Sequence, residues 1–432
     1  METTKQTVLH GWHVEQGANM ALFGSYHMPL WYRSGTKAEH LAVINAAGIF
    51  DTSHMAVVSL SGRDARGVLQ RCFSKDLRQC LGRGPLVDGR AVYGVFLSDD
   101  GTVIDDAIVC QLAAESYMVV VNASMGPAVA LRLRENAAGL AVAINDHSDR
   151  VGKMDIQGPL AARILSRVLR EPGEAFANLS YFAFRGGFGD FVAQRPVVTV
   201  DGTPLLLSRT GYTGEFGFEL FVAIERLPAL WEMVLAAGRD DGLLACGLAA
   251  RDSLRAGAVL PLSHQDIGPW PFLNNPWQFA LPWAGGGKAF TKEFLGGPAL
   301  LAASWEKHTL PFAGFDARKI GAGEGSQVTD ERGRAIGTIL TCTTDMAIGR
   351  VGGQIKSVAE DSGFAAKGLC CGFVLLDEPR QPGDTVILSD GKRRLTVEIR
   401  ADVRPSRTAR RPMSAMPGRE AEMSTLRAEV NP

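Results

Sequence analysis

Two glutamates in the segment 208–220 are the first candidates for ligand-binding chemistry. Polar and apolar residues alternate over 215–220, so a strand would place Glu215, Gly217 and Glu219 on one face and three apolar residues on the other. A carboxylate can accept hydrogen bonds from the donor edge of a flat ligand, and a glycine lets that ligand approach the backbone. Pattern alone also permits a half-buried strand with two solvated glutamates.

A second acidic group lies in a predicted meander of three strands. The expected strands are Tyr93–Leu97, Val103–Gln111 and Tyr117–Val121, joined by short polar turns. Asp105 and Asp106 are neighbours in the second strand, where successive side chains point to opposite faces. Only one aspartate can therefore face a core or a pocket, and a solvated pair near a hairpin is the alternative.

Four more residues could contact a ligand from separate segments. Tyr212 offers an amphipathic ring beside Glu219, and Asn122 directly follows the last strand of the meander. Arg251 lies at a predicted helix start, where an ion pair with a neighbour one turn away is the simpler explanation. Met55 follows His54 at the entrance to another predicted strand, and that histidine has no acidic partner nearby in sequence.

The motifs that contain these residues resemble those of one family. Residues 209–219 read Arg-Thr-Gly-Tyr-Thr-Gly-Glu-Phe-Gly-Phe-Glu, which is similar to the signature of the glycine cleavage T-protein (aminomethyltransferase) family. Residues 101–106, Gly-Thr-Val-Ile-Asp-Asp, resemble its second signature. Residues 246–255, Cys-Gly-Leu-Ala-Ala-Arg-Asp-Ser-Leu-Arg, and 51–55, Asp-Thr-Ser-His-Met, resemble two more. The resemblance covers nearly the whole chain in the family's order.

The resemblance implies a fold, a cosubstrate and a reaction. The fold would be α+β, a multi-domain T-protein-like folate-binding fold with a small C-terminal antiparallel β-barrel. Tetrahydrofolate would bind as cosubstrate, Asp105 would be the acidic residue beside its reacting nitrogens, and the partner would be lipoylated H-protein. The expected folate-site residues are Tyr212, Glu219, Asn122, Arg251, Met55 and Arg404. The implied activity is transfer of an aminomethyl group from dihydrolipoyl-H-protein to tetrahydrofolate, with release of ammonia.

The chain departs from the family pattern at the substrate end of the expected site. Where the family usually has Leu-Tyr-Gly-Gln followed by an acid, this chain has Leu262-Ser263-His264-Gln265-Asp266. An aromatic run from Trp270 to Trp283 follows. These changes favour a rival interpretation, a tetrahydrofolate-dependent O- or S-demethylase of a small organic donor, because a shared fold does not fix the donor.

Two further interpretations are weaker on the sequence. A non-catalytic folate-binding protein that assists iron–sulfur assembly would carry a Lys-Gly-Cys-Tyr-x-Gly-Gln-Glu-like motif, which this sequence lacks. The C-terminal half of a folate-linked dehydrogenase would require a flavin domain, yet no strand-linked Gly-x-Gly-x-x-Gly occurs.

Length and patterning predict three regions in the 432 residues. Residues 1–300 would form the folate-binding aminomethyltransferase region with two intertwined subdomains, 301–410 the barrel, and 411–432 a disordered tail. Within the barrel, Gly349–Gly368 is expected to be an inserted loop.

Composition sets limits on partners and location. The formal net charge of -1 gives no electrostatic reason to expect nucleic acid or an anionic membrane as partner. The seven cysteines lack metal-ligand spacing, so no metal site is expected. The first twenty residues show no targeting pattern and no apolar run approaches ~20 residues, which predicts a cytoplasmic protein without a membrane span.

Overall fold

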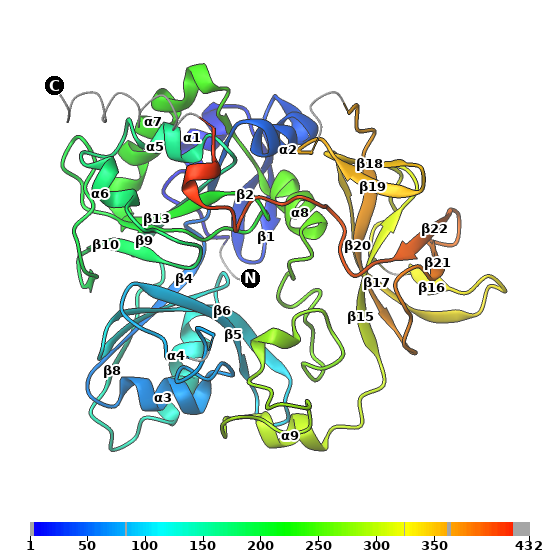
Figure 1. The fold of residues 1–432 in the computed structure, drawn as a ribbon, viewed down its shortest axis with the longest axis horizontal. Coiled ribbons are helices and arrows are strands. Elements are labelled where there is room, and N and C mark those ends of the chain that lie inside the picture. The colour runs from blue at the N-terminus through cyan, green and yellow to red at the C-terminus, as the bar shows by residue number, and fades with distance from the viewer. Residues whose placement is uncertain (1–3, 83, 324, 361–363, 418–432) are drawn as a thin grey trace.

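Two β-sheets and a β-barrel surround the central helix α8 (Leu248–Gly257) in the computed structural model (Figure 1). In that view the seven-stranded sheet lies at the upper left, the five-stranded sheet below it and the barrel at the right. The structure describes residues 4–82, 84–323, 325–360 and 364–417. The mixed α+β architecture with a C-terminal barrel confirms the predicted fold class.

The five-stranded sheet contains the predicted meander. Its order is β5 (Arg90–Leu97), β6 (Val103–Ala113), β7 (Ser116–Val121), β4 (Ala56–Ser61) and β8 (Ala143–Asp146). Alternate side chains of β6, including Ala107 and Val109, are buried in a core shared with helices α3 (Ala65–Cys72) and α4 (Gly126–Glu135). This packing fixes the other face of β6 toward the middle of the molecule.

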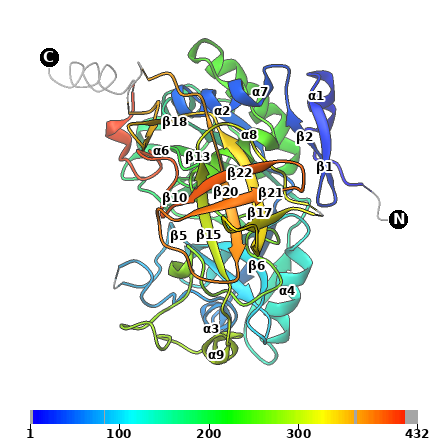
Figure 2. The same cartoon turned by 90° about the vertical axis from the view of Figure 1, so that its right-hand side faces the viewer.

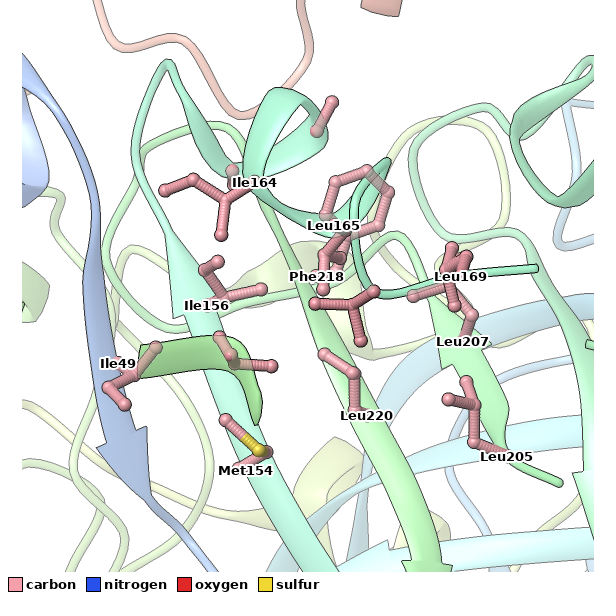
Figure 3. Close-up of a cluster of buried hydrophobic side chains, with 14 of the residues drawn as sticks. Ile49, Met154, Ile156, Ile164, Leu165, Leu169, Leu205, Leu207, Phe218 and Leu220 are labelled. Carbon is pink, nitrogen blue, oxygen red and sulfur yellow. The ribbon is translucent and has the colours of Figure 1, made fainter. Parts of the chain in front are cut away.

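The seven-stranded sheet is built around β13, which contains the second half of the glutamate segment. Its order is β11 (Phe191–Val192), β10 (Phe184–Phe188), β12 (Leu206–Ser208), β13 (Gly217–Ala223), β9 (Val151–Gln157), β3 (Gly48–Asp51) and β14 (Leu244–Ala245). Phe218 and Leu220 lie beside Met154 and Ile156 of β9 in a buried cluster (Figure 3). Burial of each such side chain contributes about 1.5–3 kcal/mol.

The C-terminal strands close into a six-stranded antiparallel barrel, which faces the viewer in Figure 2. The barrel order is β15 (His308–Gly314), β20 (Leu369–Leu376), β17 (Ala335–Asp345), β16 (Gln327–Thr329), β21 (Thr385–Ser389) and β22 (Arg394–Ile399). The predicted insertion begins as a hairpin of β18 (Ile348–Val351) and β19 (Gln354–Ser357) rather than as a structureless loop.

A hairpin and short helices complete the structure. The hairpin joins β1 (Asn19–Phe23) and β2 (Tyr26–Trp31), and its second strand lies against α8. The other helices are α1 (His10–Glu15), α2 (Gly35–Asn45), α5 (Ala161–Leu165), α6 (Pro172–Phe176), α7 (Leu227–Gly238) and α9 (Gly297–Ala302). The 3₁₀ turns are η1 (Ile224–Arg226), η2 (Arg239–Asp241), η3 (Gln278–Ala280) and η4 (Met413–Ala415).

The segment after the barrel returns across the molecule to the seven-stranded sheet (Figure 1). Met413 and Met416 are buried in the core of that sheet, so the tail predicted to be disordered from residue 411 is ordered at its start. Residues 418–432 of that predicted tail lie outside the described residues. Among the described residues, no helix has the length and apolar character needed to cross a membrane.

Candidate functional site

A cavity of about 1200 Å³ lies where the two sheets, helix α8 and the barrel meet. Its wall draws on segments from residue 21 to residue 410, so it exists only in the folded protein. Of the predicted site residues, the wall contains Met55, Asn122, Tyr212, Glu219 and Arg251. Asp105 and Arg404 are not part of it.

The acid pair of β6 is held by one asparagine. The backbone N–H of Asn122 donates to Oδ2 of Asp105 at 2.8 Å, and its side-chain Nδ2 donates to Oδ1 of Asp105 at 2.8 Å. The same Nδ2 donates to Oδ1 of Asp106 at 2.6 Å, and the Tyr93 hydroxyl donates to the other oxygen of Asp106 at 2.9 Å. Asp106 lines the cavity, whereas Asp105 has no solvent exposure.

Asp106 therefore lines the cavity, whereas Asp105, which the sequence predicted beside the reacting nitrogens, does not. Successive side chains of β6 point to opposite faces of the sheet. Asp105 shares its face with Ala107 and Val109, which pack on α3 and α4, so Asp106 points the other way. Burial and the neighbouring charge of Asp105 raise the pKa of Asp106 to about 7. Asp106 can thus exchange a proton near neutral pH, which suits general acid–base chemistry.

The opposite part of the wall contains a buried network of charges. The Lys153 ammonium of β9 donates to Oδ1 of Asp155 at 2.6 Å and to Oε1 of Glu219 at 2.6 Å. Its third hydrogen bond goes to the Thr52 hydroxyl at 3.1 Å, so all three of its donors are used. Arg251 donates to Oδ2 of Asp155 at 2.9 Å.

Opposite charges balance in this network, two cations against two carboxylates. Burial alone would raise the pKa of Asp155, but the charges of Lys153 and Arg251 outweigh it and hold that pKa below its usual range. Both charges of β9 were missed by the sequence analysis. The signal was present, since polar Lys153, Asp155 and Gln157 alternate with apolar residues as on a strand with one polar face.

Glu219 is buried but keeps capacity to bind a ligand. One of its carboxylate oxygens accepts from Lys153 and the other from the Thr210 hydroxyl, which leaves further lone pairs free. Its side chain is 10% exposed and lies in the cavity wall. The alternative of solvated glutamates is therefore wrong for this residue.

The glycine between the two glutamates has a different use from the one predicted. A Cβ on Gly217 would lie 2.5 Å from the Ile156 carbonyl oxygen and 2.7 Å from Gln157 Cα, so the glycine permits close pairing of β13 with β9. Gly217 does not line the cavity. A flat ligand would instead approach the backbone at Gly211, which does.

An aromatic–cation pair forms another part of the wall. The Arg251 guanidinium lies over the Tyr212 ring, 4.7 Å from its centre, while the Tyr212 hydroxyl donates to the Pro261 carbonyl. The hydrogen bond fixes the ring at the start of the 261–266 segment, where the sequence departs from the family. Tyr212 and Arg251, both among the predicted site residues, thus lie together although they come from different segments.

His54 is a polar wall residue with an unused ring nitrogen. It is 3% exposed, and its Nδ1 has no hydrogen-bond partner within the described part of the chain. Burial lowers the pKa of His54 to about 4, so the imidazole is neutral at pH 7. His54 and Met55 line the cavity, but the Nδ1 atom itself is buried.

Arg404 was predicted to reach the ligand but is used inside the protein. It is 1% exposed and donates to Glu215 Oε1 at 3.1 Å, to Asp345 Oδ2 at 2.6 Å and to the Thr213 carbonyl. Arg404 therefore ties the segment after the barrel to β17 and to the loop before β13. Arg407 and Arg410, farther along this segment, line the cavity instead.

The segment that departs from the family pattern also reaches the cavity. Leu262 and Gln265 line it, as do Trp277 and Phe279 from the aromatic run. Phe279 is 59% exposed, so this side of the cavity is an apolar mouth open to solvent. The changed positions Ser263 and His264 are not part of the wall, but they lie between two residues that are.

Comparison with known proteins agrees with this geometry. A family model, the GCVT N-terminal domain, matches residues 9–284, which is well over half of the chain. The aminomethyltransferase of Moorella thermoacetica is 37% identical over 269 residues, 62% of this chain and 68% of that protein. The aminomethyltransferase of Anoxybacillus flavithermus is 36% identical over 263 residues, 61% of this chain and 66% of that protein. The matched part therefore spans about two thirds of these relatives.

A solved structure extends the similarity to the C-terminal barrel. The glycine cleavage system aminomethyltransferase T of Bartonella henselae superposes with a TM-score of 0.73 and 25% identity, over 92% of this chain and 97% of that one. The sequence match and the shared fold together cover both the cavity and the barrel. On these grounds the protein belongs to the GCVT family of aminomethyltransferases, enzymes that transfer one-carbon units.

Proposed function

We propose that this protein transfers the aminomethyl carbon of aminomethyl-dihydrolipoyl-H-protein to tetrahydrofolate, with release of ammonia. The observation that carries the proposal is the pair of Asp106 and Glu219 on the wall of one cavity. The carboxyl group of Asp106 is poised to exchange a proton near pH 7, and that of Glu219 accepts a hydrogen bond from the Lys153 ammonium. The relatives' names and the shared fold support this choice of reaction.

The residues of the wall suit a folate. Free lone pairs on Glu219 would accept hydrogen bonds from the guanidine-like edge of the pterin. Tyr212 offers its ring to the flat heterocycle. Arg407 and Arg410 would attract the carboxylates of the glutamyl end.

Asp106 would carry the chemistry of the transfer. When bound, tetrahydrofolate supplies N5 and N10 as the two acceptor atoms. The carbon loses its bonds to sulfur and nitrogen and gains two bonds to the acceptor, while two protons pass from the acceptor to the thiol and to ammonia. Asp106 would stabilise the positive charge that develops on the carbon and hold one of these protons. Asn122 and Tyr93 fix the carboxyl group in place.

A demethylase is the second candidate, and the apolar mouth favours it. Trp277 and Phe279 on the wall, beside the changed segment 262–266, suit an aromatic methoxyl compound or a sulfonium as the donor. Such a donor would use the same folate end of the cavity. The two candidates therefore differ only in what enters through the mouth.

A single-turnover assay separates the candidates. Purified protein is mixed with tetrahydrofolate and aminomethylated H-protein, and ammonia and methylene-tetrahydrofolate are measured. Equal folate-dependent amounts of both products support the aminomethyltransferase. If folate binds but neither product forms, while a methoxyaromatic or sulfonium compound yields methyl-tetrahydrofolate, the demethylase replaces it.

Glu219→Gln is expected to weaken tetrahydrofolate binding by about 10- to 100-fold, because a hydrogen bond to a charged group contributes about 1.5–3 kcal/mol. Isothermal titration calorimetry measures the dissociation constant. Glu225→Gln, at an exposed position just after β13, is the matched control and should bind like the wild type. An unchanged dissociation constant for Glu219→Gln would remove this residue from the pterin site.

A further inference from the structure

The segment 262–266 places a histidine beside the buried acid pair. Nε2 of His264 lies 3.6 Å from Oδ1 of Asp105, and its side chain is 51% exposed. Asp105 itself has no exposure, so His264 stands between the carboxylate and solvent. His264 is one of the departures from the family motif, in which this position is a glycine.

The backbone at His264 explains the family's glycine and makes the histidine notable. Its φ angle is 64°, in the left-handed region that glycine adopts without strain and a branched or bulky residue rarely adopts. A histidine here bears a conformational cost that a glycine would avoid. Its imidazole makes a contact with Asp105 that a glycine cannot make.

We infer that His264 is a positioning residue for the transfer reaction, pairing with Asp105 so that the exchangeable proton of the acid pair resides on Asp106 at the cavity. This inference rests on the proposed function. In this inference His264 acts on the charge of the acid pair, whereas in the proposed function Asp106 acts on the reacting atoms.

The charges around His264 support this division of roles. Asp105 and Asp106 of β6 are the carboxylates that face it, and the Tyr93 hydroxyl is bonded to Asp106. Behind its own segment, Asp266 is paired with Arg255 and accepts from the Leu262 N–H, so that charge is already balanced. An imidazolium at His264 therefore acts on the acid pair, and on Asp105 directly.

Hydrogen bonding within the pair points the same way. Asp105 accepts two hydrogen bonds from Asn122 in addition to the His264 contact, whereas Asp106 accepts one from Asn122 and one from Tyr93. Contact with Asp105 also raises the pKa of His264 above its usual value, against the opposing effect of partial burial. The contact with Asp105 thus favours the protonated form of His264.

His264→Asn is the variant that tests the inference. Asparagine tolerates a left-handed backbone better than most residues, so the loop is retained while the titrating ring is lost. Ionisation of the pair should then require a higher pH, and the rise of turnover with pH should shift upward by about one unit. Turnover should fall about tenfold on the acidic side and equal that of the wild type at high pH, where His264 is neutral.

Two measurements make the test decisive. Single-turnover rates from pH 5.5 to 9 are compared for the wild type, His264→Asn and the control His308→Asn, whose ring lies partly exposed on β15 in the barrel. NMR titration of the His264 ring is done in the full-length wild type and in Asp105→Asn. The expected result is a pKa above 6.5 that falls in the variant.

The outcomes separate this inference from the proposed function. A wild type that forms no methylene-tetrahydrofolate overturns the proposed function, while the NMR titration still tests the pairing of His264 with Asp105. An active wild type whose pH profile is unchanged in His264→Asn overturns the positioning role. So does a His264 titration that is unaffected by Asp105→Asn.

Discussion

Asp106→Asn is expected to lower turnover by about 10²–10⁴-fold while leaving tetrahydrofolate binding within a few-fold of the wild type. The amide keeps the size of the side chain and one acceptor for the Tyr93 hydroxyl, but it carries no negative charge and cannot exchange a proton. Both contributions to the transition state are lost together. Single-turnover formation of methylene-tetrahydrofolate and calorimetric binding measure the two effects separately.

Asp105→Asn is the matched comparison for this prediction. Asp105 lies outside the cavity wall, so its loss should act through the placement and ionisation of Asp106 and should cost less than the direct replacement. If Asp105→Asn abolished turnover while Asp106→Asn retained it, the order of roles would be reversed. The sequence-based assignment of the first aspartate would then hold.

The Asp106→Asn substitution should also change how the free energy of unfolding depends on pH. The pKa of Asp106 is raised from 3.8 to about 7, so between these values the folded state holds a proton that the unfolded chain releases. Stability from this group therefore falls as pH rises from about 4 to 7, at a slope approaching 1.4 kcal/mol per pH unit. Denaturant unfolding at pH 5, 6, 7 and 8 should show this decline in the wild type and a weaker decline in Asp106→Asn.

Local patterns predicted much of the fold and part of the site. The alternation around Phe218 placed Glu219 away from the core, and the short strands after residue 308 close into the expected barrel. These features depend on period-two patterning and turn residues, which are written locally in the chain.

Features set by tertiary packing were not predictable in the same way. Whether Asp105 or Asp106 faces the cavity depends on which face of β6 the helices cover, and adjacent carboxylates give no local signal of it. Arg404 and Glu215 are 189 positions apart, so the residues next to Arg404 in the sequence could not show that it pairs with Glu215 inside the protein. Lys153 appears as a charge in an otherwise buried strand, and its partners come from three different segments.

The cavity wall therefore depends on polar contacts between residues far apart in the sequence as much as on the family motifs. Glu219 is fixed by Lys153 of β9, and Asp106 is fixed by Asn122 at the end of β7. In both cases a polar group from another segment orients the carboxylate. A motif identifies the residue that bears the carboxylate, but the hydrogen-bond partner of that carboxylate decides its charge and its orientation.

Lys153→Met is expected to destabilise the protein by about 3–5 kcal/mol at pH 7. Methionine fills similar space, but Asp155 and Glu219 lose the ammonium that lies 2.6 Å from each of them. Arg251 and Thr52 still bond Asp155, whereas Glu219 keeps only the Thr210 hydroxyl. An uncompensated carboxylate then remains in a site where Lys153 is 2% exposed, which is the costly way to break a buried ion pair.

The pH dependence of this loss has a defined sign. Because Lys153 and Arg251 hold the pKa of Asp155 below 3.8 in the wild type, that stabilisation is present above pH 4 and is lost as pH falls further. The difference between wild type and Lys153→Met should thus be largest near neutral pH and should narrow in acid. Denaturant unfolding at pH 7, at pH 4 and at two values below pH 4 measures it.

Lys292→Met is the control that separates loss of an ion pair from loss of a lysine. Lys292 is half-buried, and it donates to the carbonyl oxygens of Gln70 and Phe73, so its replacement leaves no carboxylate stranded. Burial lowers the pKa of Lys292 to about 7, so its charge is already disfavoured in the folded state. Lys292→Met should therefore cost less than Lys153→Met, and equal losses would show that the charge network at Glu219 has no special share in stability.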